Sequence, residues 1–224
     1  MTSSKRSATS KSSSAASNAL NLSANRSLPR ALELRVFEFV SADGMSRLLH
    51  VSHDMHDLVH IYLRSAAALD FSWRQNSIDG DFDFAPPSAT QRRQRAQLAQ
   101  AGLSVSRRCQ KLVVSDGLFA QKPAVLQFLS ANETTLRHVE LSGPTEHRVD
   151  FYQALASCRE LRVCDLAALR SNESNDDKQQ EAEDTALKSI IQNCKHLETF
   201  ELADFPPDVF NALLSSGRLS CLPC

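Results

Sequence analysis

The stretch Leu161-Arg-Val-Cys164-Asp-Leu166 has apolar residues at its first, fourth and sixth positions, and this spacing recurs elsewhere in the chain. The other copies are Leu136, Val139 and Leu141, and Leu197, Phe200 and Leu202. Apolar residues two positions apart point to one face of a β-strand, and the residue between them points to the other. Each copy therefore predicts a short strand with one buried face.

A helical pattern precedes two of these strands. Leu187, Ile190 and Ile191 recur at helical spacing and lead through Cys194 to Leu197. Phe151, Ala154 and Leu155 lead through Cys158 to Leu161 in the same layout. One unit is therefore a helix followed by a strand, and the sequence predicts an α/β fold built from repeats.

Over about residues 105 to 224 these units resemble the cysteine-containing leucine-rich repeat. Their first apolar positions are 25 residues (136 to 161) and 36 residues (161 to 197) apart. The family period is about 20 to 29 residues, so the second interval is expected to hold an insertion. The alternative is an ordinary α/β domain whose strands are similar by chance.

An earlier unit fits at Cys109, Leu112 and Val114, which would match Leu136, Val139 and Leu141. A second alignment, in which Cys109 corresponds to Cys158, remains open.

Residues 28 to 65 predict three helical segments. Pro29 suits a first helical turn, where its missing N–H is not needed, and Asp43-Gly44 breaks the pattern. The stretch is similar to an F-box in its Leu28-Pro29 opening, in Val36-Phe37-x-Phe39-Val40, and in Val51-Ser-x-x-Met55-x-x-Leu58. It departs from the family pattern at Ala31, Glu33 and Met55.

Together the resemblances imply a leucine-rich-repeat solenoid preceded by a small three-helix F-box-like domain. They imply the substrate-recognition subunit of a cullin–RING E3 ubiquitin ligase, with no enzymatic activity of its own. The F-box would bind a Skp-family adaptor through Leu28, Pro29, Leu32, Val36, Phe37, Leu48, Val51 and Met55. The alternative is a leucine-rich-repeat scaffold whose N-terminal helices only cap the solenoid.

The repeats would hold a protein substrate on the exposed face of the sheet. Glu140, Asp165 and Glu201 are expected in one column across neighbouring strands, because each lies between two inward-facing residues. A second column is expected to contain Arg137, Arg162 and Glu198. Pairing within the face is expected to leave Glu198 and Glu201 uncompensated. One interpretation is a solvated sheet face with no partner, since exposed charges usually serve solubility. The other is a face that receives a basic or phosphorylated segment as the substrate.

The composition is that of an ordinary soluble protein, with a formal net charge of -1 and 42% hydrophobic residues. The charge indicates no nucleic-acid partner, and no apolar run approaches the ~18 to 20 residues of a membrane span. The start of the chain lacks the apolar segment of a secretion signal. We therefore expect the cytoplasm or nucleus and no membrane partner.

Three further segments are expected outside the repeat pattern. Residues 1–27 predict a disordered Ser-rich tail, with a mitochondrial transit peptide as the alternative. An entry strand around Leu69 and Phe71 precedes a loop insertion near residues 76–95. A second insertion, residues 171–184, is acidic and predicts a solvated loop.

The cysteines and histidines predict neither a metal site nor a cofactor. Cys158, Cys164 and Cys194 occupy core positions of the repeat, so reduced, buried thiols are expected. His56 and His60 have a metal-ligand spacing but belong to the polar stripe of a helix. The calcium-like Asp79, Asp81 and Asp83 lack the bidentate Glu of an EF-hand.

At its end the chain predicts a helix from Asp208 to Ser215, opened by Pro206-Pro207 and stopped by Gly217. Leu219, Leu222 and Cys224 would then start the strand of a next repeat. No atypical polar capping repeat follows, so we expect either a fragment or a shortened gene model.

Overall fold

The computed structural model describes residues 29–72, 88–115, 121–171 and 177–217. These residues form eight α-helices and a parallel five-stranded sheet, so the α/β class is confirmed. The predicted tail (1–27), the three aspartates of the calcium-like segment and the predicted C-terminal strand (219–224) lie outside the described residues.

The first elements are a group of helices that we call the N-terminal helical unit. It comprises α1 (Arg30–Val36), the 3-10 helix η1 (Phe37–Phe39), α2 (Ala42–Leu48) and α3 (His53–Ser65). Ser41 and Ser52 begin α2 and α3, because their hydroxyl groups accept hydrogen bonds from the N–H groups of Gly44 and Met55. Helices thus make up most of the segment from Arg30 to Ser65.

Strands and helices then alternate along the rest of the chain. In order they are β1 (Ala68–Phe71), α4 (Ala89–Val105), β2 (Lys111–Val114), α5 (Lys122–Ala131), β3 (His138–Leu141), β4 (Gly143–Thr145), α6 (Arg148–Leu155), β5 (Val163–Leu166), β6 (Leu169–Ser171), α7 (Asp177–Asn193), β7 (Thr199–Leu202) and α8 (Pro207–Ser215). The helix predicted near the C-terminal end is confirmed as α8, and Gly217 after it has a φ of 65°.

The main sheet has the order β1-β2-β3-β5-β7, so each strand pairs with the strand of the unit before it. Leu112 is in register with Val139, Val139 with Cys164, and Cys164 with Phe200. Cys109 therefore corresponds to Leu136, since each lies three residues before its strand's first inward position. The alignment of Cys109 with Cys158 was wrong.

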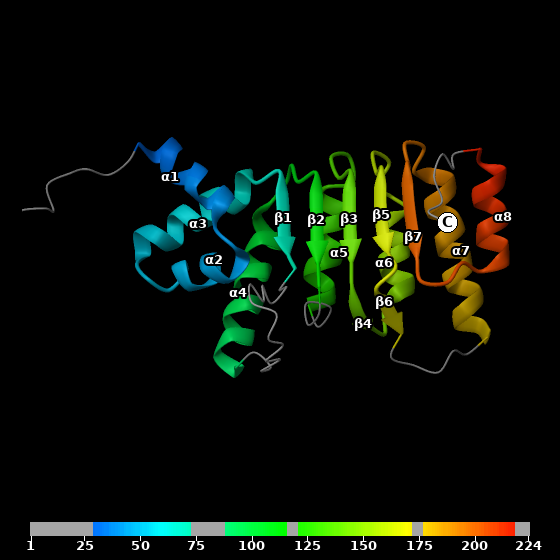
Figure 1. Ribbon diagram of the computed structural model, residues 1–224, viewed down its shortest axis with the longest axis horizontal. Coiled ribbons are helices and arrows are strands. Elements are labelled where there is room, and N and C mark those ends of the chain that lie inside the picture. Colours follow the sequence, from blue (N-terminus) through cyan, green and yellow to red (C-terminus); the bar gives the residue numbers. More distant parts are fainter. Residues whose placement is uncertain (1–28, 73–87, 116–120, 172–176, 218–224) are drawn as a thin grey trace, which may run out of the picture.

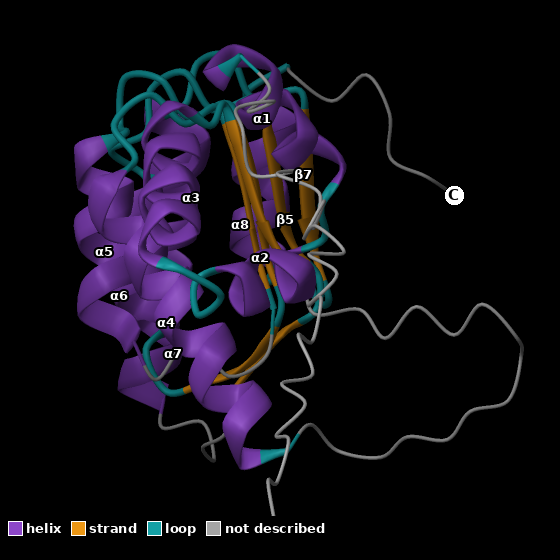
Figure 2. Ribbon diagram, turned by 90° about the vertical axis from the view of Figure 1, so that its left-hand side faces the viewer, coloured by secondary structure: helices purple, strands orange, loops and turns teal. Residues whose placement is uncertain are grey.

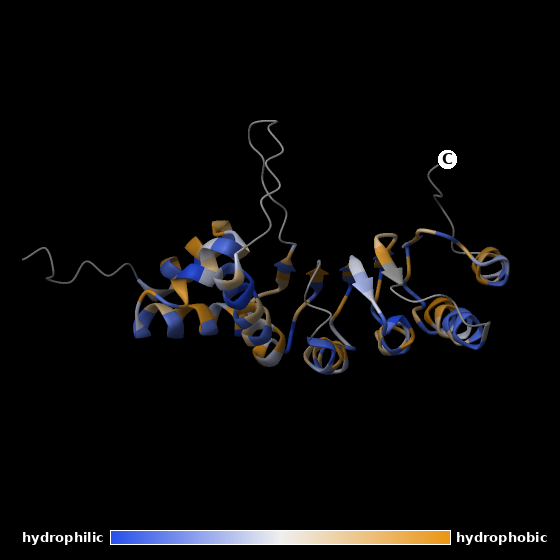
Figure 3. Cartoon of the chain, turned by 90° about the horizontal axis from the view of Figure 1, so that it is seen from below, coloured by the Kyte–Doolittle hydropathy of each residue, from blue (hydrophilic) through white to orange (hydrophobic). Residues whose placement is uncertain are grey.

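The helices cover one face of this sheet. Figures 1 and 2 show α5, α6 and α7 behind the strands, and α8 packs beside α7 at the far end. The inward residues of the strands are buried against these helices, as in Val139, Leu141 and Cys164. Figure 3 shows the strands end-on, with these helices on one side only. We call the other side the outer sheet face.

The N-terminal helical unit shares its core with the sheet. A Cβ atom added at Gly102 in α4 would lie 2.8 Å from Cζ of Phe71 and 3.5 Å from Cδ2 of Leu63. α3, α4 and β1 thus approach one another too closely for a side chain at this position. Asp43 at the start of α2 also pairs with Arg95 of α4. The unit is therefore built onto the β1 end of the sheet.

Both predicted insertions are shorter than expected. Within the predicted insertion 76–95, helix α4 begins at Ala89. Ser88 and Gln91 cap its start, because the side chain of each accepts a hydrogen bond from the backbone N–H of the other. The acidic segment 171–184 becomes helical at Asp177. Its charges are partly satisfied within the fold, since Glu183 pairs with Arg148 at 2.9 Å.

A second, two-stranded sheet was not predicted. β4 and β6 pair in parallel, and Gly143, the first residue of β4, has a φ of 117°, which favours glycine. Among the described residues, no helix combines the length and the apolar character needed to cross a lipid bilayer.

Candidate functional site

The N-terminal helical unit carries most of the exposed apolar side chains in the described part of the chain. The large hydrophobic residues with at least half of their area exposed there are Leu32 (50%), Val36 (51%), Phe39 (88%) and Val51 (67%), and only Leu214 (52%) lies elsewhere. Leu32 and Val36 are four residues apart in α1 and so share one helix face. We call Leu32, Val36, Phe39 and Val51 the N-terminal apolar surface.

The eight residues predicted to bind an adaptor differ in their exposure. Pro29, Leu32, Val36 and Val51 are exposed, and Leu28 lies outside the described residues. Leu48 and Met55 are partly buried against the core. These six positions remain compatible with a docking surface.

The burial of Phe37 does not fit the prediction that it binds an adaptor. Its side chain is buried, and its ring centroid lies 5.5 Å from that of Tyr62 in α3. A residue packed in this way supports the unit from inside and offers little surface to a partner. Phe39, which was missing from the predicted set, is the most exposed of the large hydrophobic residues described.

The outer sheet face carries the residues predicted to bind a substrate. Glu140, Asp165 and Glu201 are in register on β3, β5 and β7, as expected. We call these three carboxylates the acidic row. The chain also places Arg137, Arg162 and Glu198 side by side, since the Arg162 N–H donates to the Arg137 carbonyl and the Glu198 N–H to the Arg162 carbonyl.

Charges on this face are compensated unevenly. Oε1 of Glu140 lies 2.7 Å from Nε2 of His138 and 3.3 Å from Nζ of Lys111. Burial acts to raise the pKa of Glu140, but the hydrogen bonds from His138 and Lys111 outweigh it and lower that pKa.

The prediction that Glu198 lacks a compensating charge is wrong. Its Oε1 lies 2.9 Å from Nη1 of Arg162, with both side chains about half exposed. Glu201 is exposed and forms no ion pair within the described residues.

A groove of about 890 Å³ runs where the N-terminal helical unit meets the outer sheet face. η1 contributes Phe39, and the sheet contributes Asp70, Val113 and Glu140. Val113 is buried although it points outward from its strand. The groove therefore connects the apolar side chains of Phe39 and Val113 with the charged outer sheet face.

A buried ion pair lies at the other end of the molecule, between α6 and α7. Nη2 of Arg148 is 2.9 Å from Oε2 of Glu183, whose side chain is only 4% exposed. Burial raises the pKa of Glu183 despite this arginine. Burial also raises the pKa of the neighbouring Tyr152 to about 12. The sequence pattern missed this pair, because Glu183 stands in a run of acids that looked solvated.

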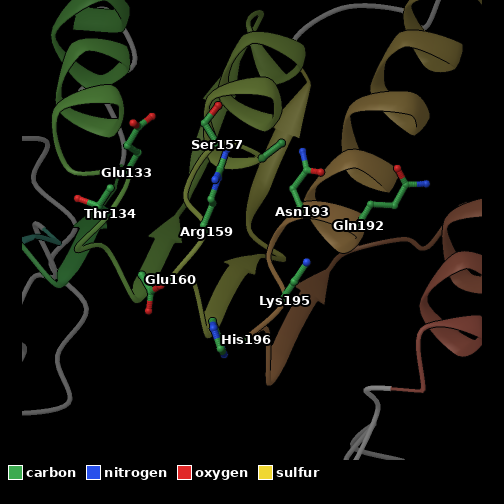
Figure 4. Close-up of a pocket in the computed structure, with 10 residues that line it drawn as sticks. Glu133, Thr134, Ser157, Arg159, Glu160, Gln192, Asn193, Lys195 and His196 are labelled. Carbon is green, nitrogen blue, oxygen red and sulfur yellow. The ribbon is translucent and has the colours of Figure 1, made fainter.

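A shallow polar pocket of about 730 Å³ lies on the rim formed by turns before β3, β5 and β7 (Figure 4). Its charged side chains are of both signs: Glu133, Glu160, Arg159 and Lys195. Figure 4 shows that these side chains do not converge on one point.

The described cysteine side chains and the pair of His56 and His60 are packed as structural residues. Cys109, Cys158, Cys164 and Cys194 are buried thiols that are not in disulfide bonds. Burial raises the pKa of Cys109 to about 11 and that of Cys158 to about 12. The rings of His56 and His60 are 4.4 Å apart, and burial together with His56 lowers the pKa of His60. Within the described ranges, no cluster of three potential metal ligands occurs.

The chain was compared with protein-family models, with curated proteins and with solved structures, and none of them matches it.

Proposed function

We propose that this protein is the substrate-recognition subunit of an F-box-type cullin–RING ubiquitin ligase. Its N-terminal helical unit binds a Skp-family adaptor, and its strand-and-helix units form a leucine-rich-repeat solenoid that holds a protein substrate. The chain itself catalyses no reaction, because ubiquitin transfer belongs to the other subunits. The proposal places the protein in the cytoplasm or nucleus.

The observation that carries the proposal is the N-terminal apolar surface. Leu32, Val36 and Val51 leave large apolar areas in solvent on a small helical unit whose own core is already filled by Phe37, Val59 and Leu63. Exposed apolar side chains that gather on one small part of a protein favour a partner interface. Their positions coincide with the F-box-like motif read from the sequence.

The regular spacing of the strand-and-helix units supports the proposed leucine-rich-repeat solenoid. The five parallel strands of the main sheet pair in the order in which they occur along the chain, and the apolar position that defines the repeat stays in register from Leu112 to Phe200. Stacking of equivalent units with their neighbours is the organisation of repeat proteins.

One observation favours a second candidate, a repeat scaffold whose helices act only as a cap. Leu63 of α3 lies in the same core as Phe71 and Leu103, so the N-terminal helical unit closes the β1 end of the sheet. A cap needs this buried contact but has no use for the exposed Leu32 and Val36. The two candidates therefore differ in what they predict for these side chains.

Size-exclusion chromatography with a purified Skp-family adaptor at micromolar concentration tests the proposal. We expect the two proteins to co-elute. Replacing Leu32 and Val36 together by Ser should weaken binding by roughly 30-fold or more, since truncating central interface residues costs about 2 kcal/mol or more. Circular dichroism should remain unchanged because both side chains are half exposed.

Leu214→Ser is the matched control, since Leu214 in α8 has the same chemistry and an exposure of 52%. This variant should bind the adaptor like the unmodified chain. Absence of co-elution for the unmodified chain would favour the scaffold with a simple cap.

A further inference from the structure

β1 is an edge strand of the main sheet, and within the described residues it pairs with β2 alone (Figure 1). The Lys111 N–H donates to the carbonyl of Ala67, and Lys111 is in register with Ala68. Successive residues of a strand direct their backbone groups to opposite sides. With this register, the N–H and C=O groups of Leu69 point toward β2, and those of Ala68 and Asp70 point to the free edge.

The free edge of β1 has room for a further strand. Ala68 and Asp70 are exposed, and their N–H and C=O groups have no hydrogen-bond partner within the described residues. Both residues line the groove of about 890 Å³ between the sheet and the N-terminal helical unit. An added strand lies about 4.8 Å from its neighbour and needs open volume beside it, and an open edge is a template for such a strand.

The groove beside β1 is lined by apolar side chains from two sides. Leu69 and Phe71 line it from β1, and Phe39, Met45 and Leu63 line it from the N-terminal helical unit. Side chains of a strand alternate between its two faces. A strand in the groove would therefore direct every second side chain toward these residues, and those positions favour apolar and β-branched side chains.

The unpaired charges of the groove are both negative. The cations that line it, Arg95 and Lys111, are each in an ion pair with a carboxylate of the groove. Glu38 and Asp70 have no ion pair within the described part of the chain, although Oδ1 of Asp70 accepts the Ser72 N–H at 2.7 Å. Asp70 points outward from β1, so it favours Lys or Arg beside it on an added strand.

We propose that an extended segment of the substrate pairs with the free edge of β1 in this groove, as an added strand in which apolar residues alternate with Lys or Arg. Hydrogen bonds to the backbone of Ala68 and Asp70 supply affinity, and the alternating side chains supply specificity. This inference rests on the proposed function, because it names the kind of segment that the ligase recognises in its substrate.

Fluorescence anisotropy with labelled synthetic peptides tests the pairing. The first probe is a short peptide in which lysine and valine alternate. The second has N-methyl groups on the valine amides only, and the third on the lysine amides only. Only one alternate set of N–H groups faces β1, so one methylated probe keeps all of its hydrogen bonds. We expect that probe to bind within about twofold of the first and the other to bind at least about tenfold more weakly.

The charge of the probe and of the groove provides the second measurement. A peptide in which glutamate and valine alternate should bind at least about tenfold more weakly than the lysine probe. Asp70→Asn should weaken binding of the lysine probe about threefold, since it removes the charge and keeps an acceptor for the Ser72 N–H. Asp54→Asn is the control, because Asp54 is an exposed aspartate of α3 outside the groove. The control variant should bind like the unmodified chain.

Equal weakening by the two methylation patterns, equal affinity for the lysine and glutamate probes, equal losses for the two variants, or absence of binding would overturn the β1 site. A dimer of the chain that the lysine probe does not dissociate in size-exclusion chromatography would assign the edge to a second copy and would also overturn it.

Adaptor co-elution of the unmodified chain, measured separately, distinguishes the two proposals. Adaptor binding without peptide binding would contradict the β1 site alone. Peptide binding without adaptor binding would contradict the ligase assignment and leave the groove as a peptide site.

Discussion

Asp43 and Arg95 form a two-pronged ion pair across 52 residues of sequence: Nε donates to Oδ1 at 2.9 Å and Nη2 donates to Oδ2 at 3.0 Å. Asp43 belongs to α2 of the N-terminal helical unit and Arg95 to α4, which packs on the sheet. The pair joins the part proposed to bind an adaptor to the part proposed to bind a substrate. A paired geometry of this kind fixes orientation as well as distance.

Asp43→Asn should destabilise the protein by about 1 kcal/mol, because the pair is partly buried and has two hydrogen bonds. Urea unfolding measures this loss. Asp54→Asn is the control, since both aspartates lie in the first turn of a helix but only Asp43 has this partner. Equal losses for the two variants would show that the contribution comes from the helix dipole.

Gly102→Val should destabilise the protein by roughly 2 kcal/mol or more. A side chain at this position meets the buried ring of Phe71, and overpacking of a core costs about 1 to 3 kcal/mol, which outweighs the slightly better helix propensity of valine relative to glycine. Gln100→Val is the control at an exposed position of the same helix. A thermal melt of Gly102→Val that matches the control would contradict the close packing of α3 on α4.

Asn132→Ala should cost about 2 to 4 kcal/mol, because a buried backbone N–H loses its acceptor and two carbonyls each lose a donor. Oδ1 of Asn132 accepts the Cys109 N–H at 3.0 Å, and Nδ2 donates to the carbonyls of Ser106 and Phe128. Asn211→Ala, at an exposed position of α8, should change the unfolding free energy by less than about 0.5 kcal/mol. A similar small effect at Asn132 would mean that water replaces its hydrogen bonds.

Cys109 and Cys158 should react slowly with a thiol reagent in the native protein and rapidly after denaturation. Both are fully buried, and burial raises their pKa, so little reactive thiolate forms near neutral pH. Mass spectrometry of the labelled peptides identifies each site. Native labelling as fast as that of the denatured chain would contradict the strand register.

From the raised pKa of Cys109 we expect the folded protein to lose stability at alkaline pH. The pKa of Cys109 is about 11 in the folded chain against an ordinary value of 9.0, so its contribution is complete below pH 9 and is lost as pH rises toward 11. The expected slope is about 1 kcal/mol per pH unit over this window for one thiol. Urea unfolding at several pH values should show a smaller slope for Cys109→Ala, and an unchanged slope would contradict the prediction.

Local spacing determined the strands and their register. Val139 and Leu141 were expected to be buried with Glu140 facing outward, and the structure has this arrangement. The alternation depends only on the two-residue period of a strand, so a few neighbouring residues suffice to predict it. For the same reason the column of Glu140, Asp165 and Glu201 followed from counting residues from equivalent positions.

Only the tertiary structure decided which apolar side chains of the N-terminal helical unit stay exposed. Val36 and Phe37 are neighbours of similar hydrophobicity, yet Val36 is 51% exposed and Phe37 is buried beside Tyr62. Nothing in the local pattern distinguishes them, because the choice depends on where α3 lies in space. Glu183 likewise looked solvated until α6 brought Arg148 within 2.9 Å of it. Burial and ion pairing depend on residues far apart in the chain, whereas strand alternation is a property of the local backbone.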